Sequence, residues 1–325
     1  MDVYLRPGQR HRRRRRNRAE AVLNGGTFAG YHPAVNLLYF VLVIGCAMAL
    51  THPVCLAVSC VCALAYSVML TGRSALRIQL RFLLPLALAA ALFNPAFSHQ
   101  GRTILAYLPD GNPLTLESVW YGLFSAGLLV TVLSWFRGVH AVMTSDKLVY
   151  LFGRVVPALS LLLSMALRFV PRFTAQLRVI AEAQRCIGRD VRSGGPIRRA
   201  KSGVRILSAL VTWALENAID TADSMKSRGY GLPGRTAFAI YRFDRRDKRA
   251  LAFLLLCGGG VIAGAAWGKL RFVYYPIISG AAPDAWQILL FVVYLALCGL
   301  PLWIEGREAW RWNRSLMAKA SFSAP

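Results

Sequence analysis

The sequence predicts an all-α membrane protein, a polytopic bundle with about six spans and long helices at the cytoplasmic face. Three observations carry this prediction. The 325 residues are 56% hydrophobic, with a mean hydropathy of +0.43, and only 17% are charged, against roughly a quarter in soluble domains. The apolar residues form separate runs that approach the length of a membrane span. The net charge of +24 is concentrated between those runs.

Six apolar segments are predicted to cross the membrane. They are residues 35–50, 52–70, 81–97, 118–136, 250–268 and 286–304. His52-Pro53 predicts a tight turn after the first span, because proline lacks an N–H and disfavours helix in the residue before it. Gly260, Gly264 and Gly268 give the fifth span a face that another helix can approach closely, either a partner or a neighbour in the bundle.

The basic residues predict the orientation of the chain. Of the 39 lysines and arginines, all but Arg102, Lys269 and Arg271 lie in residues 1–34, 71–81, 137–249 and 305–325. Positive loops lie in the cytoplasm, so both termini are expected there. The predicted order is a basic tail (1–34), N-terminal spans (35–136), a cytoplasmic or interfacial domain (137–249), C-terminal spans (250–304) and a second basic tail (305–325).

Two surface features have simple interpretations. The arginine run 12–16 favours anionic lipid over nucleic acid in a chain with several spans. Tyr274 and Tyr275, in the second outer loop, are expected to anchor the chain at the membrane interface.

Two strings in the block 137–249 end in a similar way. Residues 181–188 read AEAQRCIG and residues 224–231 read SMKSRGYG. Amphipathic helices are predicted over 171–187 and 203–228, with Gly188 and Gly229 ending them. An arginine in a last turn is favoured by the helix dipole and can bind a carboxylate in bidentate fashion. Two such ends suit two partner subunits; the alternative is a pair of ordinary glycine caps.

The sequence shows no catalytic constellation. It contains no GxxxxGK[ST] loop, HExxH or GxSxG motif, and its seven cysteines form no zinc-type pattern. Neither a metal site nor a cofactor is predicted. Two interpretations are open for the acidic residues Glu216, Asp220 and Asp223. They could form the acidic inner-face site of an integral membrane enzyme, or they could pair with nearby arginines, which is what we expect. A channel is disfavoured, because the spans contain almost no ionisable residues.

Five strings resemble one transporter family. They are Asn94-Pro95, Leu114-Thr115-Leu116-Glu117, Ala166-Leu167-Arg168-Phe169-Val170-Pro171, Glu182-Ala183-Gln184-Arg185 and Asp223-Ser224-Met225-Lys226-Ser227-Arg228-Gly229-Tyr230-Gly231. The chain, from about residue 32 to 234 and on through the last two spans, resembles the transmembrane T component of energy-coupling factor (ECF) transporters, the EcfT/CbiQ family. The family ends each coupling helix in a small residue, arginine and glycine.

The second copy of that signature is intact as Ser227-Arg228-Gly229, whereas the first reads Cys186-Ile187-Gly188. Either Arg185 or Arg189 can supply the guanidinium that the family often has at Ile187. The resemblance implies a non-catalytic transmembrane coupling subunit of an ABC importer in the cell membrane. It implies contacts with two ABC-type ATPases, which hydrolyse the ATP, and with a substrate-binding S component for a vitamin or a transition metal. The implied ATPase-coupling residues are Arg185, Cys186, Ile187, Gly188, Ser227, Arg228 and Gly229.

Overall fold

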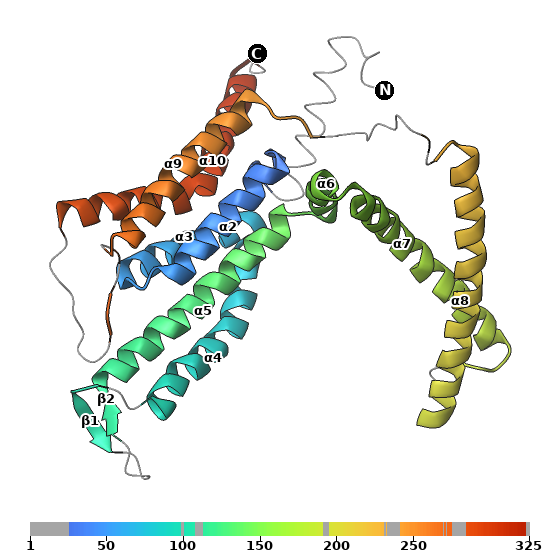
Figure 1. Ribbon diagram of the computed structural model, residues 1–325, viewed down its shortest axis with the longest axis horizontal. Coiled ribbons are helices and arrows are strands. Elements are labelled where there is room, and N and C mark those ends of the chain that lie inside the picture. Colours follow the sequence, from blue (N-terminus) through green and yellow to red (C-terminus); the bar gives the residue numbers. More distant parts are fainter. Residues whose placement is uncertain are drawn as a thin grey trace. The chain divides into compact units, whose positions relative to one another are not determined.

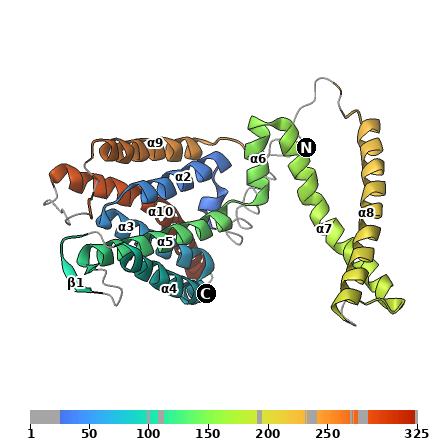
Figure 2. The same ribbon diagram turned by 60° about the horizontal axis from the view of Figure 1, so that its bottom comes forward.

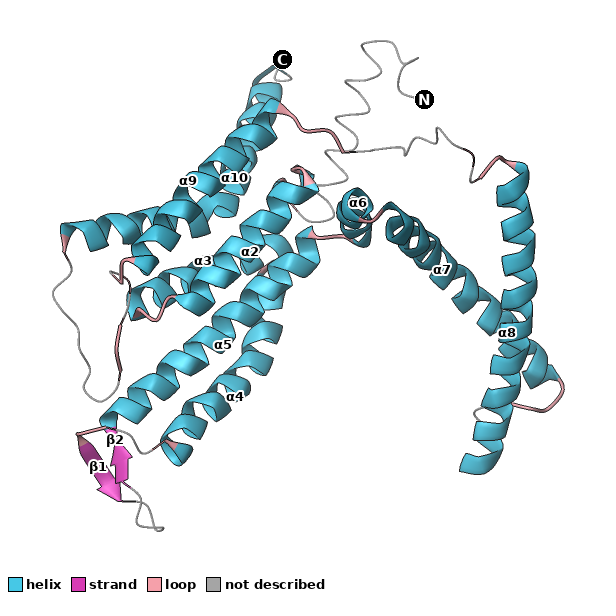
Figure 3. Ribbon diagram, in the orientation of Figure 1, coloured by secondary structure: helices cyan, strands magenta, loops and turns pink. Residues whose placement is uncertain are grey.

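The computed structural model describes residues 26–98, 101–107, 113–190, 195–230, 232, 241–268, 270, 272–274 and 284–322. The described chain is helical apart from one two-stranded hairpin (Figures 1 and 3). The elements are η2 (Phe28–Gly30), α2 (Pro33–Ala49), α3 (Pro53–Thr71), α4 (Arg73–Phe97), β1 (Ile104–Tyr107), β2 (Pro113–Thr115), α5 (Leu116–Val142), α6 (Ser145–Val155), α7 (Pro157–Cys186), α8 (Pro196–Ser227), α9 (Arg245–Ala266) and α10 (Ala285–Phe322). They form two compact units, residues 1–144 with 241–325, and residues 145–240.

The candidate membrane spans found in the described residues lie in the first unit. Four stretches are long and apolar enough to cross a membrane, namely Pro53–Leu70, Leu116–Val142, Arg245–Ala266 and Ala285–Arg311; Pro33–Ala49 and Arg81–Phe97 are apolar but shorter. Each of the six predicted spans therefore falls largely within a helix. Within this unit α5 packs against α2, α3 and α4, while α10 packs against α3 and α9. The all-α class predicted from composition is confirmed.

Aromatic and hydroxyl side chains fill the centre of this bundle. Trp135 is fully buried, and its indole Nε1 donates a hydrogen bond to the Ser59 hydroxyl at 2.9 Å. The Tyr39 hydroxyl donates to the Cys298 carbonyl at 3.0 Å. The Tyr39 ring lies edge-on to Trp135, with 5.9 Å between ring centroids. A buried indole N–H or phenol O–H normally finds an acceptor, and these two bonds tie α2, α3, α5 and α10 together.

Two His-Pro pairs start the first two helices in the same way. His32 precedes Pro33 at the start of α2, and its Nδ1 accepts the Ala34 N–H at 3.2 Å. His52 precedes Pro53 at the start of α3, and its Nδ1 accepts the Val54 N–H at 3.3 Å. Proline suits the first helical position because its missing N–H would have no intrahelical partner. The turn predicted at His52-Pro53 is thus also a helix cap.

The start of α9 is bonded to the segment that leads into α2. Asp247 is 3% exposed. One of its carboxylate oxygens accepts the His32 N–H at 3.3 Å, and the other accepts the Asp244 N–H at 3.0 Å. Arg246 donates to the Gly30 carbonyl at 2.9 Å, with its guanidinium 4.3 Å from the centroid of the Tyr31 ring. Asp244 and Asp247 form a capping box at the start of α9. The bonds from Asp247 and Arg246 hold this start against the segment that leads into α2.

The chain before α5 is held by a buried carboxylate. Glu117 is 3% exposed and accepts the Thr103 hydroxyl at 2.9 Å and the Thr103 N–H at 3.2 Å. It also accepts the Arg102 N–H at 3.3 Å. The adjoining strands β1 and β2 pair antiparallel. Glu117 thereby fixes one strand of the hairpin against the first turn of α5.

Tyr274, which the sequence suggested as an interfacial anchor, is buried within the protein. Its side chain is 7% exposed, and its hydroxyl donates to the Thr51 carbonyl at 3.2 Å. Its ring contacts Phe124 and Phe272, at centroid distances of 5.1 and 4.8 Å. Residues 272–274 therefore pack on the α2–α3 turn. Burial within this cluster raises the pKa of Tyr274 to about 12. Tyr275 lies outside the described residues.

The second unit consists of α6, α7 and α8. Three details differ from the prediction. Helix α6 was not predicted, α7 continues through Pro171, and α8 begins at Pro196. Proline at the first helical position lets α8 start early. Within α7, Pro171 removes one hydrogen bond and its ring crowds the carbonyl of the preceding turn, yet the helix continues through it. The amphipathic helix predicted from Pro171 onward is thus the second half of a longer helix that begins at Pro157.

Candidate functional site

The two strings singled out in the sequence both end helices with the same backbone geometry. At the end of α7 the Gly188 N–H donates to the Arg185 carbonyl at 2.9 Å, and the Arg189 N–H to the Gln184 carbonyl at 3.0 Å. At the end of α8 the Gly229 N–H donates to the Lys226 carbonyl, and the Tyr230 N–H to the Met225 carbonyl, each at 3.0 Å. Both pairs of bonds define a Schellman motif. We call residues 185–189 the first tip and residues 226–230 the second tip.

Glycine is required at the turn of each tip. Gly188 has φ +76° and Gly229 has φ +79°, a left-handed conformation that costs other residues roughly 1–2 kcal/mol. A Cβ on Gly188 would meet no atom within 4 Å, so the backbone angle alone sets the requirement there. The sequence therefore correctly located the ends of both helices, and for the physical reason it gave.

Helices α7 and α8 cross near their centres, so the tips lie on separate arms (Figures 1 and 2). Phe173 and Trp213 meet at the crossing, with ring centroids 5.7 Å apart. The Arg172 guanidinium lies 5.6 Å from the Trp213 ring centroid. At about 1.5 Å per residue, each tip extends roughly 20 Å beyond the crossing. A crossed pair of stiff helices can thus present two separate contact points.

The side chains of the two tips are exposed but differ in their pairing. Arg185 forms an ion pair with Asp190, 3.6 Å between Nε and the carboxylate, while 71% of the Arg185 side chain stays exposed. An exposed pair of this kind contributes about 0–1 kcal/mol, so it orients the side chain without locking it. Ile187 is 65% exposed. Arg189 and Arg228 are exposed, and among the residues that the structure describes neither is in an ion pair.

The acidic residues of α8 do not form the ion pairs that the sequence suggested. Glu216, Asp220 and Asp223 are exposed on one side of the helix. Within the described part of the chain none of them forms an ion pair. They line neither of the two described pockets, and no group of three His, Cys, Asp or Glu side chains in the described residues could hold a metal ion.

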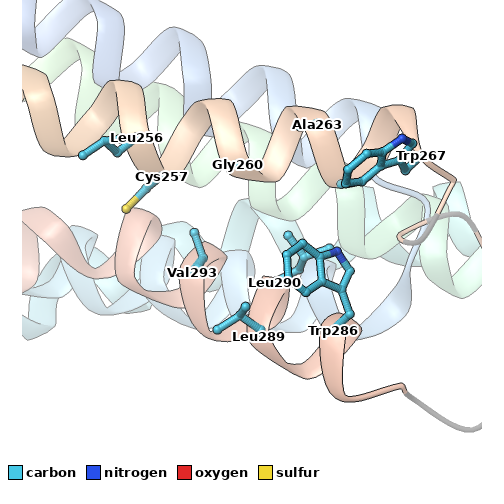
Figure 4. A pocket seen from close by; sticks show the side chains of 10 residues that line it. Leu256, Cys257, Gly260, Ala263, Trp267, Trp286, Leu289, Leu290 and Val293 are labelled. Carbon is cyan, nitrogen blue, oxygen red and sulfur yellow. The ribbon is translucent and has the colours of Figure 1, made fainter.

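The three glycines predicted for helix packing occupy three different environments. Gly264 faces α10, and a Cβ there would lie 2.5 Å from a methyl carbon of Leu290. Gly260 borders an apolar groove of about 360 Å³ between α9 and α10, and a Cβ there would meet no atom within 4 Å. Trp267 and Trp286 flank one end of this groove (Figure 4). Gly268 follows the helix with φ +72°.

Besides Glu117, sequence reasoning missed two further buried charges, Asp247 and Lys147. Asp247 was detectable, because Asp244-Arg245-Arg246-Asp247 precedes an apolar run and matches a capping box. Lys147 in α6 gave no comparable signal; it is 6% exposed, and burial lowers the pKa of its amine to about 8. Asp247 lies in the first unit and Lys147 in the second, and neither belongs to a tip.

Comparison with known proteins agrees with this architecture. A family model described as cobalt transport protein, CbiQ, matches residues 30–238. Over 110 residues the chain is 40% identical to the energy-coupling factor transporter transmembrane protein EcfT of Lactobacillus helveticus (strain DPC 4571), a match that covers 34% of this chain and 40% of the relative. The protein of the same name from Leuconostoc gelidum subsp. gasicomitatum is 38% identical over 104 residues, or 32% and 39% of the two chains. That from Thermosediminibacter oceani is 35% identical over 127 residues, or 38% and 48%.

The chain has apolar helices of span length and a separate helical unit that lies between α5 and α9 in the sequence. These features define a multi-pass, all-α membrane protein. The matched model covers more than half of the chain, and the chain belongs to the CbiQ family of cobalt transport proteins. In each of the three pairwise matches the aligned stretch spans less than half of the relative's length.

Proposed function

We propose that the chain is the non-catalytic transmembrane coupling subunit of an ECF-type ABC importer. In this proposal the two tips contact two ABC-type ATPase subunits, which bind and hydrolyse ATP. The spans contact a membrane S component that binds a vitamin or a transition metal ion. The complex lies in the cell membrane, with both termini of this chain in the cytoplasm.

One observation carries the proposal: two crossed helices end in the same Schellman motif, each with exposed cationic side chains at its tip. In this proposal the crossed pair transmits motion from the ATPases to the rest of the chain. Each arm is suited to this because it is a single helix, of 30 residues in α7 and 32 in α8. A Schellman end fixes the direction in which neighbouring side chains leave the helix. Arginine is well suited to the carboxylate of a partner, because its planar fork forms two parallel hydrogen bonds.

The alternative, an integral membrane enzyme that uses Glu216, Asp220 and Asp223, has less support. A general acid or base needs a site that holds substrate within hydrogen-bond reach. These carboxylates are exposed, and neither described pocket includes them. Replacing all three by amides is expected to leave transport by the assembled complex unchanged.

The test is charge reversal at the second tip. We expect Arg228→Glu to lower the amount of ATPase that co-purifies with the chain by at least about tenfold, because a carboxylate would then face the partner carboxylate. Substrate uptake by cells should fall in parallel, while the chain remains in the membrane.

Arg205→Glu is the matched control, since Arg205 is exposed on the same helix but distant from the tip. It should assemble and transport normally. Unchanged assembly and uptake in Arg228→Glu would contradict the proposed function.

A further inference from the structure

An apolar groove lies between α9 and α10, two helices that are long and apolar enough to cross a membrane. Its volume is about 360 Å³, at the lower end of the roughly 300–1,000 Å³ that ligand pockets have. The lining consists of aliphatic side chains, two tryptophans, one cysteine and two glycines, and none of these residues is charged (Figure 4). Leu256 and Trp267, which line it, are 77% and 76% exposed. In a membrane the groove is therefore in contact with lipid.

The groove suits neither water nor a further helix. A buried water needs two to four polar partners, and this lining is apolar. A third helix would need the small residues of α9, because they let backbones approach closely. Gly264 is already covered, since a Cβ there would lie 2.5 Å from a methyl carbon of Leu290. A Cβ on Gly260 would meet no atom within 4 Å. The two glycines therefore do not offer one continuous face to a helix about 10–12 Å across.

The groove runs from one membrane surface to about the midplane. Trp267 directly follows α9 and Trp286 is in the first turn of α10, so both indoles lie at the same end of the groove (Figure 4). Tryptophan is enriched at the level of the lipid headgroups. At about 1.5 Å per residue, the lining extends roughly 16 Å along α9, from Trp267 to Leu256. The hydrocarbon core is about 30 Å thick, so this length matches the part that one leaflet fills.

We propose that the groove binds one acyl chain of a phospholipid from the leaflet on the tryptophan side. The ester groups of the lipid lie level with Trp267 and Trp286, whose indoles combine an apolar body with a polar N–H. The methyl end of the acyl chain reaches Leu256 and Val293. With both termini of the protein in the cytoplasm, this leaflet is the outer one. The site is independent of what the tips contact.

Gly260 gives the acyl chain its space. A side chain there would project into the groove without meeting protein atoms. Gly259, the preceding residue, is equally open but does not line the groove. The same substitution at these two neighbours therefore has different consequences. A leucine at Gly260 would compete with the acyl chain, whereas a leucine at Gly259 would extend into bulk lipid.

The bound acyl chain should stabilise the packing of α9 against α10. A ligand that binds only the folded chain raises stability, and more so at higher ligand concentration. Phosphatidylcholine returned to the delipidated protein should thus raise its thermal unfolding midpoint. This rise should be smaller in Gly260→Leu than in Gly259→Leu, because the leucine at Gly260 fills part of the groove itself.

The direct test uses the full chain in phosphatidylcholine vesicles that contain a small fraction of photoactivatable phosphatidylcholine. Two probes are compared, one with a diazirine near the ester of one acyl chain and one with the diazirine near its methyl end. After irradiation the labelled residues are mapped. We expect the first probe to label the protein next to Trp267 and Trp286, and the second to label it next to Leu256 and Val293. Labelling is expressed relative to α4, where Leu88 is 60% exposed and reports on bulk lipid.

The two glycine variants provide the matched comparison. Gly260→Leu should lower the labelling of α9 and α10 at least about fivefold, because the leucine overlaps the acyl chain. Gly259→Leu should leave this labelling nearly unchanged. An unfolding midpoint of Gly260→Leu close to that of the unaltered chain, both free of added lipid, shows that the loss of label is not a loss of fold. The pattern of the two probes in the unaltered chain tests the site even if this variant does not fold.

Three results would overturn the proposal. Equal labelling of the two variants, or labelling of α9 and α10 no stronger than that of α4, would show that the groove contacts bulk lipid only. A reversed pattern of the two probes would show that the acyl chain does not enter from the tryptophan side. Label that appears in the isolated chain but not in a complex with other membrane proteins would show that a partner's helix fills the groove in place of lipid.

Discussion

The indole Nε1 of Trp135 lies 2.9 Å from the Ser59 hydroxyl, and this hydrogen bond joins two helices at the centre of the candidate membrane bundle. Neither residue is near a terminus of its helix. Because bulk water is absent there, the indole can find an acceptor only within the protein. The bond therefore fixes how α3 and α5 are rotated against each other, and with them the aromatic side chains around Trp135.

Ser59→Ala should destabilise the bundle. It leaves a buried indole N–H without an acceptor, which costs about 1–3 kcal/mol in proteins generally and about 1 kcal/mol in membrane bundles. Thermal unfolding in detergent measures the effect. Ser134→Ala is the control, since the Ser134 hydroxyl donates to the Val130 carbonyl within its own helix. Equal losses in the two variants would show that the bond between helices is unimportant.

His52 should make stability depend on pH. Burial lowers the pKa of the His52 imidazole, so the unfolded chain binds a proton more readily than the folded one. Stability is therefore retained at pH 7.5 and falls as pH drops through the unfolded value near 6.5. Protonation also removes the Nδ1 acceptor of the Val54 N–H, a cap worth about 1 kcal/mol.

The check is His52→Asn, which keeps a capping oxygen but does not titrate. Between pH 7.5 and pH 5 its unfolding midpoint should fall less than that of the unaltered protein. Parallel curves would exclude His52 as the source of the pH dependence.

Asp247→Asn should weaken the contact between α9 and the start of α2. An amide has only one oxygen, so either the His32 N–H or the Asp244 N–H loses its acceptor. We expect a loss of about 1–3 kcal/mol, measured by denaturant or thermal unfolding. Asp223→Asn, at an exposed and unpaired carboxylate, should change stability little, and a similar loss there would point to net charge instead.

The glycines of α9 should respond differently to added bulk. A leucine at Gly264 would collide with Leu290, which is 4% exposed, and overpacking of this kind costs about 1–3 kcal/mol. A leucine at Gly259 meets nothing within 4 Å of its Cβ and should be tolerated. The unfolding midpoints of Gly264→Leu and Gly259→Leu provide the comparison, and equal midpoints would show that α9 and α10 pack more loosely than described.

The sequence predicted the helices well but their lengths poorly. Apolar runs identify the part of a helix that a membrane can cover, and each of the six predicted segments falls largely within a helix, four of which are long enough to cross a membrane. It stops where polar residues begin, whereas α4 starts at Arg73 and α10 continues to Phe322. Backbone hydrogen bonding carries a helix beyond its apolar part until a cap or a break ends it. Gly188 and Gly229 are such ends, and they were predicted because glycine alone adopts their backbone angles readily.

The sequence could not predict which polar residues would be buried. Glu117 and Ser59 are residue types that usually lie at the surface, and only their positions in the folded bundle give them partners. For the same reason, the ion pairs expected for Glu216, Asp220 and Asp223 do not form among the residues that the structure describes. A count of nearby arginines along the chain does not say which of them share a face of the structure.

The bond between Asp247 and the His32 N–H joins residues 215 positions apart, and this separation matters during biosynthesis. A ribosome adds about 5–20 residues per second, so α2 emerges roughly 10–40 seconds before the carboxylate that secures its first turn. During that interval the leading helix must be held by the insertion machinery or by lipid. The N-terminal half of the protein is therefore expected to be the part most open to quality-control proteases in a nascent chain that stalls before residue 247.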